Sequence, residues 1–121
     1  MSSAKDKGDR YERELAAYMS ERLGLKIQRT IMSGGGRSMD QLPDLEGTPD
    51  IWVEAKRTER FEPRKAMAQA IVGKTKRHCP DMPVVINRPS RVPTGDSMVF
   101  LRLDDFLTLY AAYLKSEGVT D

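Results

Sequence analysis

The stretch that decides the fold is Asp44-Leu-Glu-Gly-Thr-Pro-Asp-Ile-Trp-Val-Glu-Ala-Lys-Arg57. It predicts a short strand, a Gly/Pro turn and a second strand from Ile51 to Arg57, paired as a hairpin. Because successive side chains of a strand leave on opposite faces, Glu54 and Lys56 share one face. The turn would bring the Asp44 carboxylate beside Glu54, so two carboxylates and an ammonium group are expected at one spot.

This combination of groups suits metal-dependent cleavage of a phosphodiester. Two carboxylates, completed by waters and a substrate phosphate, are what Mg²⁺ accepts. The ion would cancel charge on the phosphoryl oxygen and lower the pKa of a coordinated water, which then attacks the phosphodiester. Lys56 would orient that water or stabilise the transition state. The alternative is a surface strand with a cross-strand ion pair, because Glu-x-Lys alone is a common pattern.

The segments before this stretch predict a helix and a strand. Apolar residues recur at helical spacing from about Asp9 to Leu23, and Gly24 provides a stop. Leu25 to Met32 alternates apolar and polar residues as a strand does, and the run from Ser33 to Ser38 breaks any regular element.

The segments after it predict two helices and two strands. A helix starts at Pro63 and ends before Cys79, and strands are expected at Met82 to Asn87 and at Ser97 to Leu103. The final helix runs from about Asp104 to Ser116, capped by Asp104 or Asp105. Its expected apolar face comprises Phe106, Leu107, Leu109, Tyr110 and Tyr113.

The element order predicts one α/β domain over residues 1–121, with a central mixed sheet of about five strands flanked by helices. Residues 1–7 and 117–121 are expected to be flexible tails. No stretch approaches the roughly 20 apolar residues of a spanning helix, so we expect a cytoplasmic protein. With one cysteine and one histidine, a metal would have to sit on oxygen ligands.

Charge is unevenly distributed although the net charge is only +2. Between Lys56 and Arg77 there are eight basic and two acidic residues, whereas the segment after Asp96 is acidic. The basic region could meet phosphates and the acidic one could not. A solvated charged helix is the alternative.

Four segments resemble the successive motifs of the archaeal-type Holliday junction resolvases and their phage relatives, which are PD-(D/E)XK nucleases. The resemblance covers roughly residues 7 to 110. It implies a restriction-endonuclease-like core and a Mg²⁺-dependent endodeoxyribonuclease, with Mn²⁺ as a substitute. It also implies a homodimer that cuts four-way DNA junctions by paired nicks in DNA recombination and repair. The segments are Lys7-Gly-Asp-Arg-Tyr-Glu-Arg-Glu-Leu15, Ser33-Gly-Gly-Gly-Arg37, Pro43-Asp44 and Val53-Glu-Ala-Lys-Arg57.

The resemblance also implies roles for individual residues. Glu12 would add to the metal site and Arg13 would support substrate binding, although Glu12 also fits a solvated helix position. Ser33 would lie near the scissile phosphate, with Ser38 as its substitute. Gln69 corresponds to a glutamine that related nucleases often carry on this helix, and a plain polar helix residue is its alternative.

Two choices remain around the Pro-Asp pairs and the DNA surface. Asp44 is preferred to Asp50 as metal ligand because Asp50 is only four residues before Glu54, about 13 Å away along an extended strand.

A phosphate-tracking surface would give affinity without base readout. Its candidates are Arg29, Arg37, Arg57, Arg60, Arg64, Lys65, Lys74 and Lys76.

Three other functions fit the same residues. The site would also serve a restriction-like, nicking or flap/fork endonuclease. A DNA-binding module without catalysis would use the basic helix alone, and a structural protein would use neither. The dimer interface stays open, since Ile71, Val72, Met82 and the aromatic residues of the last helix fit core packing equally well.

Overall fold

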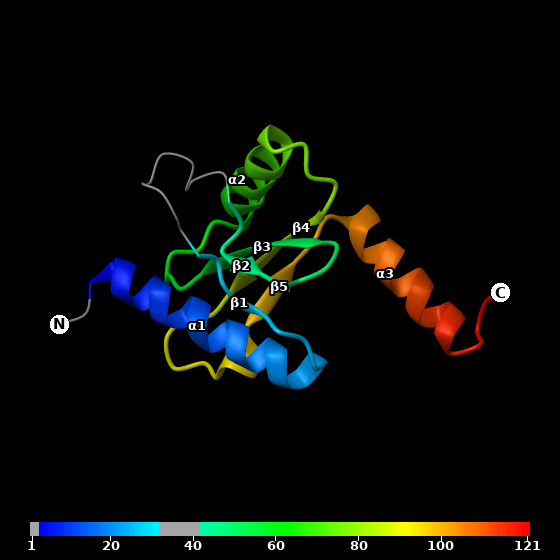
Figure 1. The fold of residues 1–121 in the computed structure, drawn as a ribbon, viewed down its shortest axis with the longest axis horizontal. Coiled ribbons are helices and arrows are strands. Elements are labelled where there is room, and N and C mark those ends of the chain that lie inside the picture. Colours follow the sequence, from blue (N-terminus) through cyan, green and yellow to red (C-terminus); the bar gives the residue numbers. More distant parts are fainter. Residues whose placement is uncertain (1–2, 32–41) are drawn as a thin grey trace.

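The computed structural model describes residues 3–31 and 42–121, which fold as an α/β domain. Within these ranges three α-helices and five strands follow one another in the predicted order (Figure 1). The elements are α1 (Ala4–Leu23), β1 (Gln28–Arg29), β2 (Leu45–Glu46), β3 (Ile51–Lys56), α2 (Pro63–Lys76), β4 (Met82–Asn87), the short 3₁₀ turn η2 (Thr94–Asp96), β5 (Met98–Phe100) and α3 (Leu103–Ser116).

Helix α1 begins five residues earlier than the apolar periodicity predicts. Ser3 caps the helix by accepting a hydrogen bond from the Asp6 N–H, and the Asp6 carboxylate accepts one from the Ser3 N–H. This reciprocal capping box satisfies two otherwise unpaired amides, so residues 4–7, which were expected in the N-terminal tail, belong to the helix. The helix ends at Leu23, and Gly24 takes the left-handed conformation as expected.

The strands form two ladders. β1 pairs antiparallel with β2, while β4 lies between its parallel neighbour β3 and its antiparallel neighbour β5. The Asp44 N–H donates to the Val53 carbonyl at 2.8 Å and thereby ties the start of β2 to β3. The predicted mixed arrangement is confirmed, but the strand expected over Leu25 to Met32 is limited to Gln28–Arg29 in the described residues.

Helix α2 connects the parallel strands β3 and β4 and packs on both of them, as the predicted crossover helix should. The two faces of β3 therefore have different neighbours. Val53 belongs to the main apolar core, which α1 completes with Tyr11 and Leu15. Trp52 and Glu54 alternate with Val53 along the strand and therefore point to the opposite face, which α2 covers.

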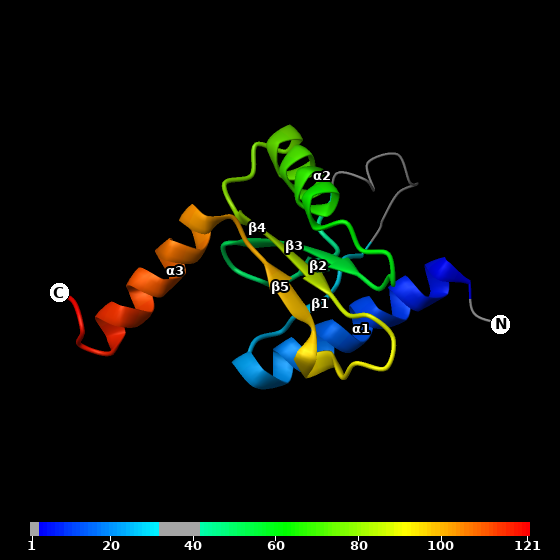
Figure 2. The same ribbon diagram turned by 180° about the vertical axis from the view of Figure 1, so that it is seen from behind.

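Helix α3 differs from its prediction in its N-cap. The sequence left open whether its apolar side chains pack on the domain or form an interface, and none of its residues is buried. The helix projects away from the sheet in both views (Figures 1 and 2). Its N-cap is Arg102, which makes no side-chain capping bond, so Asp104 and Asp105 lie within the first turn and neither is the cap.

No helix in residues 3–31 or 42–121 has the length and apolar character needed to cross a membrane.

Candidate active site

The three residues singled out by their spacing lie together where β2 and β3 meet. An Asp44 carboxylate oxygen accepts a hydrogen bond from the Ala55 N–H at 2.7 Å. The carboxyl groups of Asp44 and Glu54 are close enough for each to influence the pKa of the other, and the Lys56 ammonium is near enough to lower the pKa of both. The predicted convergence of two acids and an amine is therefore present.

The backbone around Asp44 is fixed from both sides. Its carbonyl accepts from the Thr30 N–H at 3.0 Å, and its N–H donates to β3. The Thr30 hydroxyl donates to the Pro43 carbonyl at 2.6 Å. The Pro-Asp pair is thus held between the end of β1 and the strand that carries Glu54 and Lys56, which is why the hairpin aims Asp44 at Glu54.

Both carboxyl groups have raised pKa values. Burial raises the pKa of Glu54 from its ordinary 4.5 to about 8, and the negative charge of Asp44 adds to the rise. Burial also raises the pKa of Asp44, partly offset by the Ala55 N–H. Since Glu54 is only 4% exposed, the second negative charge is unfavourable there unless a proton or a cation balances it.

This pair fits a divalent cation. Two neighbouring carboxylates provide hard oxygen ligands and a local excess of negative charge. Among residues 3–31 and 42–121 no three acidic, histidine or cysteine side chains are grouped closely enough to enclose an ion. An ion held here would therefore keep several waters or coordinate phosphate oxygens of a substrate, which is the usual coordination of Mg²⁺ in proteins.

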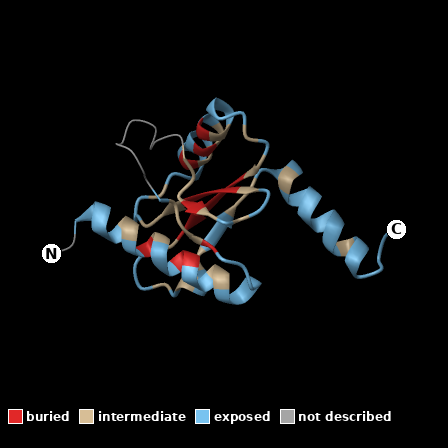
Figure 3. Ribbon diagram, in the orientation of Figure 1, coloured by how far each residue is buried: buried red, intermediate tan, exposed pale blue. Residues whose placement is uncertain are grey.

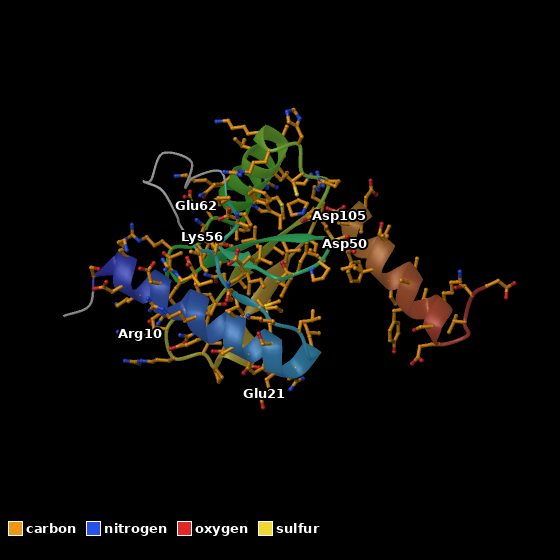
Figure 4. The ribbon with its side chains drawn as sticks, in the orientation of Figure 1. Arg10, Glu21, Asp50, Lys56, Glu62 and Asp105 are labelled. Atoms are coloured by element: carbon orange, nitrogen blue, oxygen red, sulfur yellow. The ribbon has the colours of Figure 1, made fainter. Side chains whose placement is uncertain are left out.

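Lys56 is positioned by α2. Its ammonium donates to the side-chain carbonyl of Gln69 at 3.1 Å, so Lys56 contacts the glutamine singled out by the resemblance. Both line a hollow of about 170 Å³ between the end of β3 and the start of α2. Figure 4 shows Lys56 beside Glu62, which precedes α2. Basic and aromatic side chains complete this hollow, namely Arg60, Phe61 and Lys65.

Asn87 is a site-supporting residue that the sequence analysis missed. It ends β4 directly beside Lys56 and is buried. Its side-chain amide donates to the carbonyls of Lys56 and Thr58, at 3.1 and 3.4 Å. The sequence signal that could have indicated Asn87 is a polar residue at the end of an apolar strand, as in Met-Pro-Val-Val-Ile-Asn87.

Glu12 lies near Asp44 and is held by Arg29. Arg29 donates to Glu12 and Asp9, each at 2.8 Å. Burial raises the pKa of Glu12, and the charge of Asp44 contributes to that rise. Glu12, Asp9, Arg29 and Asp44 line one hollow of about 140 Å³.

Arg29 therefore differs from its expected place on an open phosphate-tracking surface, because two carboxylates hold it. Asp9 was missed. It lies three residues before Glu12, on the same helical face.

The other predicted positions are spread around this centre. Arg13 is exposed on α1, and Arg64, Lys65 and Lys76 are exposed on α2. Arg57 contacts Glu59 at 3.4 Å and Ser90 at 3.2 Å. The remaining basic candidates are Arg60, which is exposed, and Lys74, which is half-buried. Ser33, Ser38 and Arg37 lie outside the described residues.

The competing Pro-Asp pair lies elsewhere. Asp50 sits in the turn before β3, with a φ of 67°, and its carbonyl accepts from the Met82 N–H. It is therefore at the opposite end of β3 from Lys56 (Figure 4). This placement agrees with the preference for Asp44.

Comparison with solved structures supports the fold. The domain resembles the structure of Hjc, a Holliday junction resolvase from the archaeal hyperthermophile Archaeoglobus fulgidus, with a TM-score of 0.51. The match has 16% sequence identity and covers 78% of this chain and 76% of that one. At this identity the likeness concerns the fold. A comparison with curated proteins found no match.

Comparison with family models extends over most of the sequence. Residues 3–113 match the model described as "Phage putative PDDEXK endonuclease". The matched range includes α1, the Asp44 hairpin, Glu54, Lys56 and most of α3. The chain therefore belongs to this phage PDDEXK endonuclease family.

Proposed function

We propose that this protein is a Mg²⁺-dependent, structure-selective endodeoxyribonuclease that resolves four-way DNA junctions by paired nicks. The observation that carries the proposal is the pair of Asp44 and Glu54 beside the Lys56 ammonium, two neighbouring carboxyl groups whose pKa values burial raises. Such a pair is costly as a structural feature, since burying two like charges destabilises a fold. It is useful where a divalent cation balances the two negative charges in place of a proton.

Each residue of the centre has a defined task. Bound at Asp44 and Glu54, Mg²⁺ or Mn²⁺ would supply Lewis acidity toward the phosphodiester and a more acidic water. The Ala55 N–H holds one Asp44 oxygen in place. Lys56, fixed by Gln69, orients the attacking water and stabilises negative charge on the phosphoryl oxygens as one P–O bond forms and the opposite one breaks.

Glu12 and Arg29 form a supporting group at the edge of the centre. The ion pair keeps the Glu12 carboxylate turned toward Arg29, within the hollow that Asp44 also lines. From there Glu12 would accept a hydrogen bond from a water of a bound metal ion. Arg29 acts through Glu12, so it is a positioning residue in this proposal and not part of the phosphate-binding surface.

DNA would bind across the exposed cations beside the centre. Arg60 and Lys65 line the hollow next to Lys56, and Arg64 and Lys76 extend the positive surface along α2. Contacts of this kind bind the phosphate backbone without base readout and weaken steeply with salt. Substrate choice would follow the shape of the DNA. Symmetric nicks require two active sites, hence a homodimer acting in the host cytoplasm.

Family membership and the fold shared with Hjc support a nuclease acting on branched DNA. The same centre would also serve a restriction-like, nicking or flap/fork endonuclease. A direct comparison of substrates distinguishes them. Labelled four-way junction, matched duplex and flap DNA are incubated with protein and Mg²⁺ or with EDTA, and the products are resolved on a sequencing gel.

We expect Mg²⁺-dependent, symmetrically placed nicks in the junction and little cleavage of the duplex. Asp44→Asn should abolish them, and Asp50→Asn is the matched control because its carboxylate belongs to the second Pro-Asp pair, outside the centre. Equal cleavage of duplex or flap DNA would contradict junction resolution and support one of the related nuclease activities. DNA binding without product in either Mg²⁺ or Mn²⁺ would contradict catalysis and support a DNA-binding module.

A further inference from the structure

The proposed chemistry leaves one large surface unused, the apolar side of α3. Six of its large apolar side chains are each between 46% and 69% exposed, and the whole helix appears in the exposed or half-buried colours (Figure 3). An apolar patch of this size on an isolated domain marks a site of association. The side chains are Leu103, Phe106, Leu107, Leu109, Tyr110 and Tyr113.

These side chains form an ordered stripe. Leu103, Leu107 and Tyr110 are spaced by four and three residues, so they lie along one line of the helix surface. Phe106 and Tyr113 flank that line on one edge. The aromatic rings stack along the helix, with centroids 5.8 Å apart for Phe106 and Tyr110 and 6.4 Å apart for Tyr110 and Tyr113. The rings are thus already ordered before any partner binds, which lowers the entropy cost of association.

The charges of α3 are arranged symmetrically about its middle. Asp104 lies in the first turn and Lys115 in the last. They are eleven residues apart, about three helical turns, so both flank the other edge of the stripe. Neither makes an ion pair within residues 3–31 and 42–121. The acidic end and the basic end are equally far from the helix centre near Leu109.

We propose that α3 is a dimerisation helix that pairs antiparallel with α3 of a second copy of this chain, across a two-fold axis near Leu109. In this register Asp104 lies opposite the partner's Lys115, and Phe106 lies opposite the partner's Tyr113. A parallel arrangement would instead bring the edge with Asp104 and Lys115 beside the Phe106 edge of the partner, so neither charge would find an opposite charge. The antiparallel arrangement also pairs the opposite ends of the two helix dipoles.

The surface is large enough for this purpose. A large side chain buries on the order of 150–250 Å² when fully covered, and these six have about half their surface free. Together they offer roughly 600 Å² per protomer, the lower end of what each partner contributes to a specific complex. The choice of a second copy rests on the proposed function, in which paired nicks need two sites. The location of the interface rests only on the exposed side chains of α3.

Oligomeric state tests the inference. Sedimentation equilibrium of the full chain should show a reversible dimer. Leu107→Glu should raise the dimer dissociation constant at least about 100-fold, because each substitution occurs twice across a two-fold axis. Ala112→Glu, on the opposite side of the helix, is the matched control and should change it less than threefold. Because both side chains are exposed, circular dichroism should show that each variant folds.

A charge exchange tests the register. Asp104→Lys and Lys115→Asp should each weaken the dimer, and the double variant should recover most of the wild-type affinity. A protein that is still monomeric at a concentration of about 100 μM would overturn the inference. So would a dimer that Leu107→Glu leaves intact. A dimer in which the double variant is no tighter than the single ones would overturn it as well.

These outcomes are independent of catalysis. Mg²⁺-dependent nicking by a protein whose α3 does not dimerise would refute the α3 pairing and leave the nuclease centre standing. An α3-dependent dimer that cuts no DNA would refute the proposed function and leave the α3 pairing standing.

Discussion

Replacing Glu54 by glutamine is expected to stabilise the metal-free protein at high pH. In the folded protein the pKa of Glu54 is about 8, against an ordinary value of 4.5. Between these values the folded state keeps a proton that the unfolded state releases. Stability from this group is therefore fully present below pH 4.5 and is lost as pH rises through 8.

The size of the effect follows from the same shift. Each pKa unit corresponds to about 1.36 kcal/mol. The rise in the pKa of Glu54 therefore sets an upper limit near 5 kcal/mol on the stability that is lost when Glu54 ionises, and its coupling to Asp44 reduces this loss to a few kcal/mol. Glutamine keeps the shape and can still donate a hydrogen bond to Asp44, but it never ionises. The variant should therefore match the wild type near pH 5 and exceed its stability by roughly 2–4 kcal/mol near pH 9.

Urea denaturation in EDTA at a series of pH values measures this difference directly. Adding Mg²⁺ at pH 8 should raise the stability of the wild type through binding to the folded state, and should raise that of the variant far less. If Glu54→Gln were as stable as the wild type or less stable at pH 9, Glu54 would not be a buried, charge-repelled carboxyl and the account of the metal pair would be wrong.

Three other outcomes are expected. Gly47→Ala should lower the free energy of unfolding by roughly 2 kcal/mol or more, because Gly47 has a φ of 88° and an added Cβ would overlap the Lys26 carbonyl. The control Gly118→Ala, with a φ of 75° and open space around it, should cost only about 1 kcal/mol in the same urea titration. Asn87→Ala should cost about 1–3 kcal/mol, since two buried carbonyls lose their donor, and an unchanged urea midpoint would contradict its role. Gln69→Ala should lower the single-turnover cleavage rate about tenfold at saturating DNA while the DNA dissociation constant changes little, because Lys56 loses its orienting acceptor. A rate within twofold of wild type would show that Lys56 needs no such support.

The centre of the site could be predicted because it depends on local rules. Alternation along β3 puts Glu54 and Lys56 on one face, and a glycine turn limits where Asp44 can lie. Both are properties of a short segment. The capping box of Ser3 and Asp6 was equally local and legible, and reading it would have placed the start of α1 correctly.

The surroundings of the site could not be predicted in the same way. Arg29 meets Glu12 and Asp9 only because β1 folds back along α1, a contact between distant parts of the sequence. From the sequence alone a basic residue such as Arg29 is a candidate phosphate ligand, whereas in the structure Arg29 forms ion pairs with two carboxylates. Asn87 supports Lys56 through the parallel pairing of β3 with β4, which no local pattern specifies.

The exposed α3 shows another limit. Its spacing correctly indicates an amphipathic helix, because apolar residues recur on one side. The spacing does not say what covers that side. A helix that packs on its own domain and a helix that packs on a second copy have the same pattern, and only the position of α3 relative to the sheet separates them.

The most direct test of the central claim is the rate of Mg²⁺-dependent nicking by Asp44→Asn, Glu54→Gln and Lys56→Ala on one labelled four-way junction, beside wild type and Asp50→Asn. We predict that the first three lose at least about a thousandfold in rate while still folding and binding the junction, and that Asp50→Asn cuts like the wild type. Undiminished cutting by any of the three centre variants would contradict the claim that these residues form the active site.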